Sequence, residues 1–158
     1  MHGVDDPAIE AAVRAYVKLT RAERAVSARL EKRLAAQGLT PTQLGVLELL
    51  LHKGACGQRE IGRKVLTSAG NLTDVIDKLE ARGLVFRVRE AEDRRHVRVE
   101  LTPAGRCRIE AVFPGHARDI AAAMGGLSTA ELEQFSALLR RLGTAAADAP
   151  LEIEDIAS

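Results

Sequence analysis

Aromatic residues are scarce in this sequence, which has no Trp, one Tyr and three Phe among 158 residues. Because hydrophobic residues still make up 46% of the chain, we expect a core of useful size built from aliphatic side chains. No apolar run approaches the roughly 18 residues of a membrane-spanning helix, so no membrane partner is expected. The N-terminus MHGVDDPAIE lacks the basic start and apolar run of a signal peptide. We expect one cytoplasmic domain, the default at this length.

Metal-binding and catalytic patterns are also missing. The two cysteines, Cys56 and Cys107, lie far apart and have no metal-ligand spacing, which indicates unpaired thiols in a reducing compartment. The four histidines form no H-x-x-x-H pair or other ligand spacing: His2, His52, His96 and His116. We find no Ser/His/Asp arrangement, glycine-rich phosphate loop or convincing carboxylate pair. The sequence therefore predicts neither an enzyme nor a bound cofactor or metal.

Net charge is nearly absent, at +1, but it is unevenly distributed. Residues 58–108 hold 12 Lys and Arg against 8 Asp and Glu, whereas residues 109–158 hold 3 against 8. A local basic region is what a phosphate-binding surface needs, so the middle of the chain is where a nucleic-acid contact is expected.

Helix starts are marked by polar caps followed by proline. Asp6-Pro7 begins a helix that Gly38 ends, and its length is unusual for one small domain, so we expect it to pack on something outside its own fold. Thr40-Pro41 begins the next, with Gln43 completing a capping box. Four helices are predicted before residue 84, at about 7–38, 41–53, 58–65 and 68–82.

The period of the pattern then changes from helix to strand. Apolar and polar residues alternate over 84–90 and over 96–101, which predicts two strands of a β-hairpin. Thr102-Pro103 begins a helix to about residue 124, with a bend at Pro114, and a capping box at Ser128 begins a last helix that ends near Gly143. Two short helices followed by a hairpin make a winged helix-turn-helix, in a mainly α (α+β) chain.

The second short helix would be the recognition helix, whose first turns touch base edges in the major groove. The residues that would face DNA are polar and lie on or beside it: Ser68, Asn71, Thr73, Asp74 and Lys78, with Arg59 on the preceding helix near a phosphate. For each residue alone, a cap or an exposed side chain explains its presence equally well.

The hairpin tip is cationic and carries Asp93, Arg94, Arg95 and His96. Arginines enter a narrow minor groove because its potential is strongly negative, and a carboxylate beside them can orient a guanidinium. Alternatively the tip is a solvated loop, in which Asp93 is only a turn residue.

Three segments together resemble the MarR (multiple antibiotic resistance regulator) family of transcription factors. They are DKLEARGLVFR at 77–87, DRR at 93–95 and VELTPAG at 99–105, and the resemblance covers roughly residues 38–122. It implies that Asp93 orients Arg95 in the minor groove. It also implies an obligate homodimer that reads a pseudo-palindrome in double-stranded DNA. In it, residues 1–38 and 102–143 form the dimerisation region, 39–101 bind DNA, and 144–158 form an acidic tail.

The resemblance also implies a small aromatic or phenolic effector that releases a repressor. LTSAGNLTDVIDKLEARG and FPGHA are similar to a branch with phenol- and quinone-responsive members. Polar residues on helices that border such a cleft are Tyr16, Arg21, His52 and His116, although each is equally a surface side chain.

Two alternatives remain. A thiol switch would use Cys56, in a loop before a helix, or Cys107, which the cations Arg106 and Arg108 flank. Buried, inert thiols equally explain both cysteines. Winged helices also serve as protein-interaction modules. The cationic tip together with the polar recognition helix favours DNA.

Overall fold

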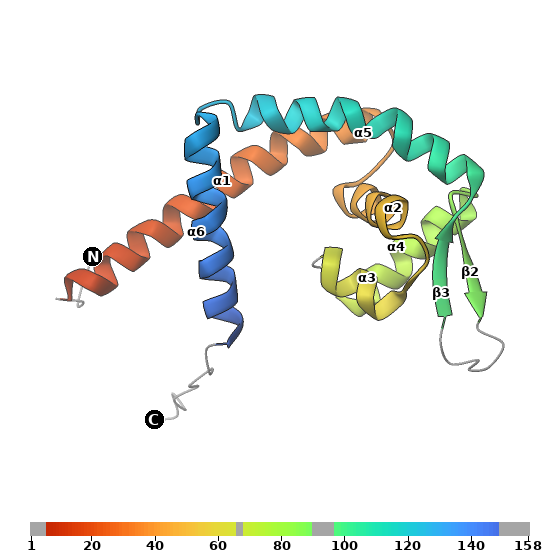
Figure 1. Ribbon diagram of the computed structural model, residues 1–158, viewed down its shortest axis with the longest axis horizontal. Coiled ribbons are helices and arrows are strands. Elements are labelled where there is room, and N and C mark those ends of the chain that lie inside the picture. The colour runs from red at the N-terminus through yellow and green to blue at the C-terminus, as the bar shows by residue number, and fades with distance from the viewer. Residues whose placement is uncertain (1–5, 66–67, 90–96, 149–158) are drawn as a thin grey trace. The chain divides into compact units, whose positions relative to one another are not determined.

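The computed structural model describes residues 6–65, 68–89 and 97–148. Its elements are α1 (Pro7–Ala36), α2 (Pro41–Lys53), β1 (Cys56–Gly57), α3 (Gln58–Val65), α4 (Ala69–Ala81), β2 (Val85–Arg89), β3 (Val97–Leu101), α5 (Pro103–Ala123) and α6 (Thr129–Asp148) (Figure 1). The chain divides after Ala123 into two compact units, of which the second carries α6. No helix in the described ranges is long and apolar enough to cross a membrane.

The capping residues begin the first two helices where the sequence predicted. The Asp6 carboxylate accepts a hydrogen bond from the backbone N–H of Ala8 at 2.8 Å. The Thr40 hydroxyl accepts from the Gln43 N–H at 3.2 Å, and the Gln43 side chain accepts from the Thr40 N–H at 3.1 Å. Each bond satisfies a backbone donor that the first helical turn leaves unpaired.

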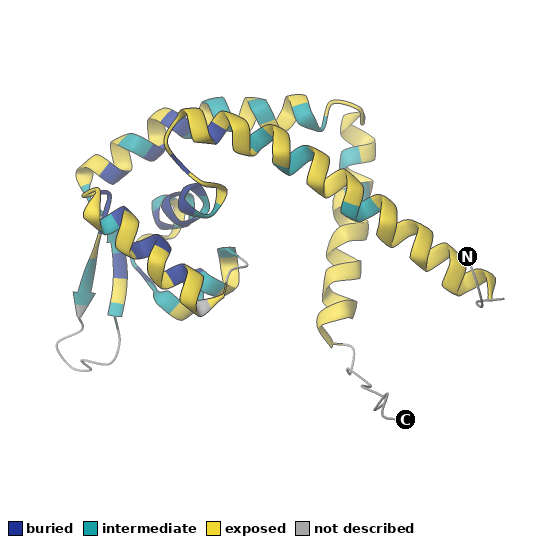
Figure 2. Ribbon diagram, turned by 180° about the vertical axis from the view of Figure 1, so that it is seen from behind, coloured by how far each residue is buried: buried dark blue, intermediate teal, exposed yellow. Residues whose placement is uncertain are grey.

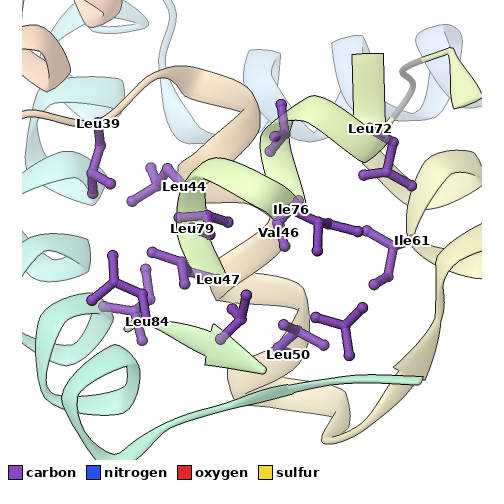
Figure 3. Packing of buried hydrophobic residues seen from close by; sticks show 14 of the residues in the cluster. Leu39, Leu44, Val46, Leu47, Leu50, Ile61, Leu72, Ile76, Leu79 and Leu84 are labelled. Carbon is purple, nitrogen blue, oxygen red and sulfur yellow. The ribbon is translucent and has the colours of Figure 1, made fainter. Parts of the chain in front are cut away.

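The core of the first unit is aliphatic, as the composition predicted. Figure 3 shows leucine, isoleucine and valine side chains of α2, α3 and α4 packed together. Leu47, Ile61, Ile76 and Leu79 are completely buried. Burying one such side chain stabilises the fold by about 1.5–3 kcal/mol, so this cluster fixes which faces of α3 and α4 remain outside.

A three-stranded antiparallel sheet with the order β1-β3-β2 completes the winged helix. Val85 and Val99 lie on its buried face, while Phe86 is 40% exposed on the other face. The sequence missed β1: it assigned Cys56 to a loop, but Cys56 pairs with Val99. Two residues carry no detectable alternation, so only the pairing partner reveals this strand.

The start of α5 packs directly against the start of the wing. Thr102 caps the helix by accepting from the Gly105 N–H at 2.9 Å and donates to the carbonyl oxygen of Gly83 at 2.6 Å. A Cβ on Gly105 would stand 1.9 Å from the carbonyl oxygen of Leu84, so this approach requires glycine.

Helix α5 runs through Pro114 to Ala123, close to its predicted end near residue 124. Helix α6 differs from the prediction, because it continues past Gly143, where its end was predicted, to Asp148. The sequence Thr-Ala-Ala-Ala-Asp that follows Gly143 has enough helix propensity to extend α6 across that glycine.

Candidate nucleic-acid interface

Helix α4 presents one polar face because its apolar face is fixed in the core. Leu72, Ile76 and Leu79 are at most 3% exposed. With 3.6 residues per turn, the remaining positions point away from the core. The helix begins at Ser68, whose hydroxyl accepts from the Asn71 N–H at 3.3 Å.

The predicted contact residues of this region are all exposed. Asn71, Thr73, Asp74 and Lys78 lie on α4, and Ser68 caps it. Arg59 is exposed on α3, one helix earlier, as are Arg63 and Lys64. The structure thus brings five of the predicted contact residues to a single helix and its cap, and Arg59 to the helix before it. The remaining four, Asp93, Arg94, Arg95 and His96, lie outside the described residues.

A clamp at Arg87 joins the wing to α4, and sequence reasoning missed it. The guanidinium of Arg87, on β2, donates to Asp77 Oδ1 at 2.5 Å and to a carboxylate oxygen of Glu80. Glu80 also accepts from the Arg87 backbone N–H at 3.0 Å. Two carboxylates one turn apart on α4 therefore hold the adjacent strand by side chain and backbone together.

The electrostatics of the clamp favour the charged form of the Arg87 guanidinium. Burial by itself would lower the pKa of Arg87, but the hydrogen bonds and charges of Asp77 and Glu80 outweigh it, so the pKa is raised. The sequence signal that could have revealed the clamp is the spacing of Asp77 and Glu80 at i and i+3 on the helix, followed by Arg87 on the strand.

Other arginines tie the wing and α4 to their surroundings. Arg98 of β3 donates to the carbonyl oxygen of Ala55 at 2.7 Å. Arg82, at the C-terminal end of α4, donates to the carbonyl oxygen of Gly38 at 2.8 Å. These cations serve the fold, so the region's basic charge is only partly available to a ligand.

The four predicted ligand residues do not share one cavity. His52 lines a cavity of about 480 Å³, which is also bordered by Pro41, Thr42, Gly45, Glu48, Leu49, Lys64 and Val65. The rings of His52 and Phe113 pack edge to face, with their centroids 6.2 Å apart. His116 lines a neighbouring cavity of about 180 Å³ between α1, α2 and α5. Its Nδ1 atom is buried and has no hydrogen-bond partner among the described residues. Tyr16 and Arg21 are exposed on α1 and border neither cavity.

The cysteines differ in exposure. Cys56 is 2% exposed and contacts the Gly54 carbonyl oxygen at 3.5 Å through its sulfur, as a buried thiol does. Cys107 is exposed on α5. In the part of the chain that the structure describes, no three His, Cys, Asp or Glu side chains gather into a metal site.

Known proteins with similar sequences and structures share this architecture. The model of the MarR family matches residues 39–97. The HTH-type transcriptional regulator MhqR of Bacillus subtilis is 36% identical over 85% of this chain and 92% of its own length.

Two solved structures share the fold. BpsR of Bordetella bronchiseptica, whose DNA binding is regulated by 6-hydroxynicotinic acid, is 30% identical, with a TM-score of 0.76 over 82% of this chain and 98% of its own. A cysteine-to-serine mutant of MarR from E. coli, complexed with operator DNA, has the same TM-score of 0.76 at 21% identity, over 87% of this chain and 99% of its own.

Proposed function

Because this chain belongs to the MarR family of DNA-binding transcriptional regulators, we propose that it works as a homodimeric repressor released from its operator by a small aromatic acid. The relatives it matches are regulators rather than enzymes. The observation that carries the proposal is the outward polar face of α4, held against the wing by Arg87. Such a regulator works beside the chromosome, so the proposed location is the cytoplasm.

In the proposed complex, α4 lies in the major groove and the wing tip in the adjacent minor groove. Asn71 and its neighbours on the first turns of α4 meet base edges, while Arg59 approaches a phosphate. Arg95, oriented by Asp93, enters the minor groove. The clamp at Arg87 supports this arrangement because it fixes the base of the wing relative to α4.

Unburied apolar side chains support a homodimer. On α1, Ile9 is 48% exposed and Val13 44%; on α6, Leu138 is 53% and Leu142 54% exposed. No residue of α6 is buried (Figure 2). Helices with such faces bury them against a partner, which is the role we propose for a second copy of the chain.

The 480 Å³ cavity beside His52 is the proposed effector site. It lies within the size range of small-molecule pockets and offers Leu49 and Val65 to an aromatic ring, with His52 and Lys64 for a carboxylate. It joins α2 to α3, the helix before α4, so an occupant that prefers one position of α3 would bias DNA binding. BpsR, a 30% identical relative, responds to an aromatic acid.

The test is binding to labelled duplex DNA from upstream of the protein's own gene. We expect a Kd that rises steeply with salt, because phosphate contacts release counterions. Arg95→Ala should weaken binding by about tenfold, whereas Arg141→Ala, which removes the same charge from α6, should have little effect. Addition of 6-hydroxynicotinic acid or salicylic acid should release the DNA. Salt-independent binding, or none, would contradict the proposal.

A further inference from the structure

Helix α4 carries three carboxylates, and only two of them form an ion pair with a cation among the described residues. Asp77 and Glu80 both bind Arg87. Asp74, one turn before Asp77, is exposed and has no hydrogen bond or ion pair in the described ranges. Asp74 therefore places a negative charge without a partner among the described residues on the same face of α4 as Asn71 and Lys78.

The fold gives Asp74 no structural task. It lies beyond the first turn of α4, which begins at Ala69, so the helix dipole gains little from it, and Ser68 already caps the helix. Lys78, four residues later, does not pair with it in the structure, and exposed pairs of this kind are weak. A carboxylate facing phosphates also opposes binding, so its presence on this face needs a compensating contact.

We propose that Asp74 selects cytosine in the operator. The inference rests on the proposed placement of α4 in the major groove. There the exocyclic amine of cytosine donates a hydrogen bond, which a carboxylate accepts, whereas guanine offers N7 and O6 as acceptors and thymine offers O4. Ionised Asp74 carries no proton to donate to those acceptors, so it repels them. Adenine also offers an exocyclic amine, but beside the N7 acceptor, which repels a carboxylate, so it attracts Asp74 less than cytosine does. Asp74 therefore acts by attraction to the cytosine amine and by repulsion of the acceptors on the other bases.

The closing experiment selects bound sequences from a randomised duplex DNA library, using the full-length protein. Wild type should enrich a motif with cytosine at one position of each half-site, and changing that cytosine should weaken binding by about tenfold. Asp74→Ala should lose the preference at that position alone. Asp74→Asn should move it toward adenine, which an amide can bind bidentately. Circular dichroism checks that both variants remain folded.

A matched control is Glu133→Ala, which removes one negative charge from exposed α6 and should leave the motif unchanged. If Asp74→Ala enriches the same motif as wild type, cytosine included, the role of Asp74 is overturned while DNA binding stands. If wild type enriches no motif, the proposed function fails together with this inference. A uniform gain of affinity in both Asp74→Ala and Glu133→Ala, with the motif intact, would reduce Asp74 to general charge and likewise overturn the proposal.

Discussion

Replacing Arg87 with alanine removes the clamp between β2 and α4 while leaving every buried apolar side chain in place. Both carboxylates of the clamp would then stand without their cation, one turn apart on the same helix. The Glu80 carboxylate would keep only the bond from the backbone N–H at position 87. We expect a folded but less stable protein whose wing is held less firmly.

The size of the effect follows from the exposure of the three side chains. Arg87 is 24% exposed, Glu80 38% and Asp77 56%. The exposed pair with Asp77 contributes roughly 0.5 kcal/mol, and the more sheltered bond with Glu80 about 1–2 kcal/mol. Arg87→Ala should therefore lower the free energy of unfolding by about 2 kcal/mol. At about 2–4 °C per kcal/mol for a chain of this size, Tm should fall by about 4–8 °C.

The assay is urea denaturation at a fixed protomer concentration, because assembly makes stability concentration-dependent. Arg63→Ala is the matched control: Arg63 is exposed on α3 without a hydrogen bond or ion pair in the described ranges, so a change within about 0.5 kcal/mol is expected. Arg87→Lys should fall between the two, because an ammonium keeps the charge but not the planar fork. If Arg87→Ala matched Arg63→Ala, the clamp would not contribute to stability.

Three further outcomes are expected. In thermal unfolding, Gly105→Ala should destabilise the protein by about 2 kcal/mol or more, because its Cβ would collide with the Leu84 backbone. The control Gly115→Ala has open space in the same helix and should stabilise the protein by up to about 1 kcal/mol. Equal effects of the two substitutions would refute the close approach at Gly105. Leu138→Glu should shift sedimentation toward the monomer, and an unchanged dimer would remove α6 from the interface. Hydrogen bonds from Ser128 lower the pKa of Glu131, so this interaction stabilises above the carboxyl's ordinary pKa and is lost as pH falls through the lowered value. In Ser128→Ala, NMR titration should show that pKa rising, and an unchanged pKa would exclude the capping bond.

Local signals in the sequence predicted most of the first unit. Each of α1, α2 and α5 begins at a capped proline, and the buried leucines of α4 recur at helical spacing, which already determines that its polar residues face outward. Strand β1 was missed because its two residues carry no pattern of their own, and it exists only as a partner of β3.

The sequence reasoning missed the clamp and the separation of the cavities for a different reason. Alternation places Arg87 on the same sheet face as the buried Val85, where a charged side chain is not expected. The structure explains its position, because α4 packs against this face and offers the carboxylates of Asp77 and Glu80. Likewise, His52 and His116 were predicted to border one cleft, but the packing of α1, α2 and α5 puts them in separate cavities. Both depend on which helices and strands approach one another, and local sequence patterns do not fix that packing.

Whether two winged helices read one operator can be decided by hydroxyl-radical footprinting on DNA from upstream of the protein's own gene. We expect two protected patches related by a pseudo-dyad and centred about 34 Å apart, one turn of the duplex, with flanking minor-groove protection that Arg95→Ala removes. A single protected patch, or protection without sequence preference along the fragment, would contradict the proposed dimeric regulator.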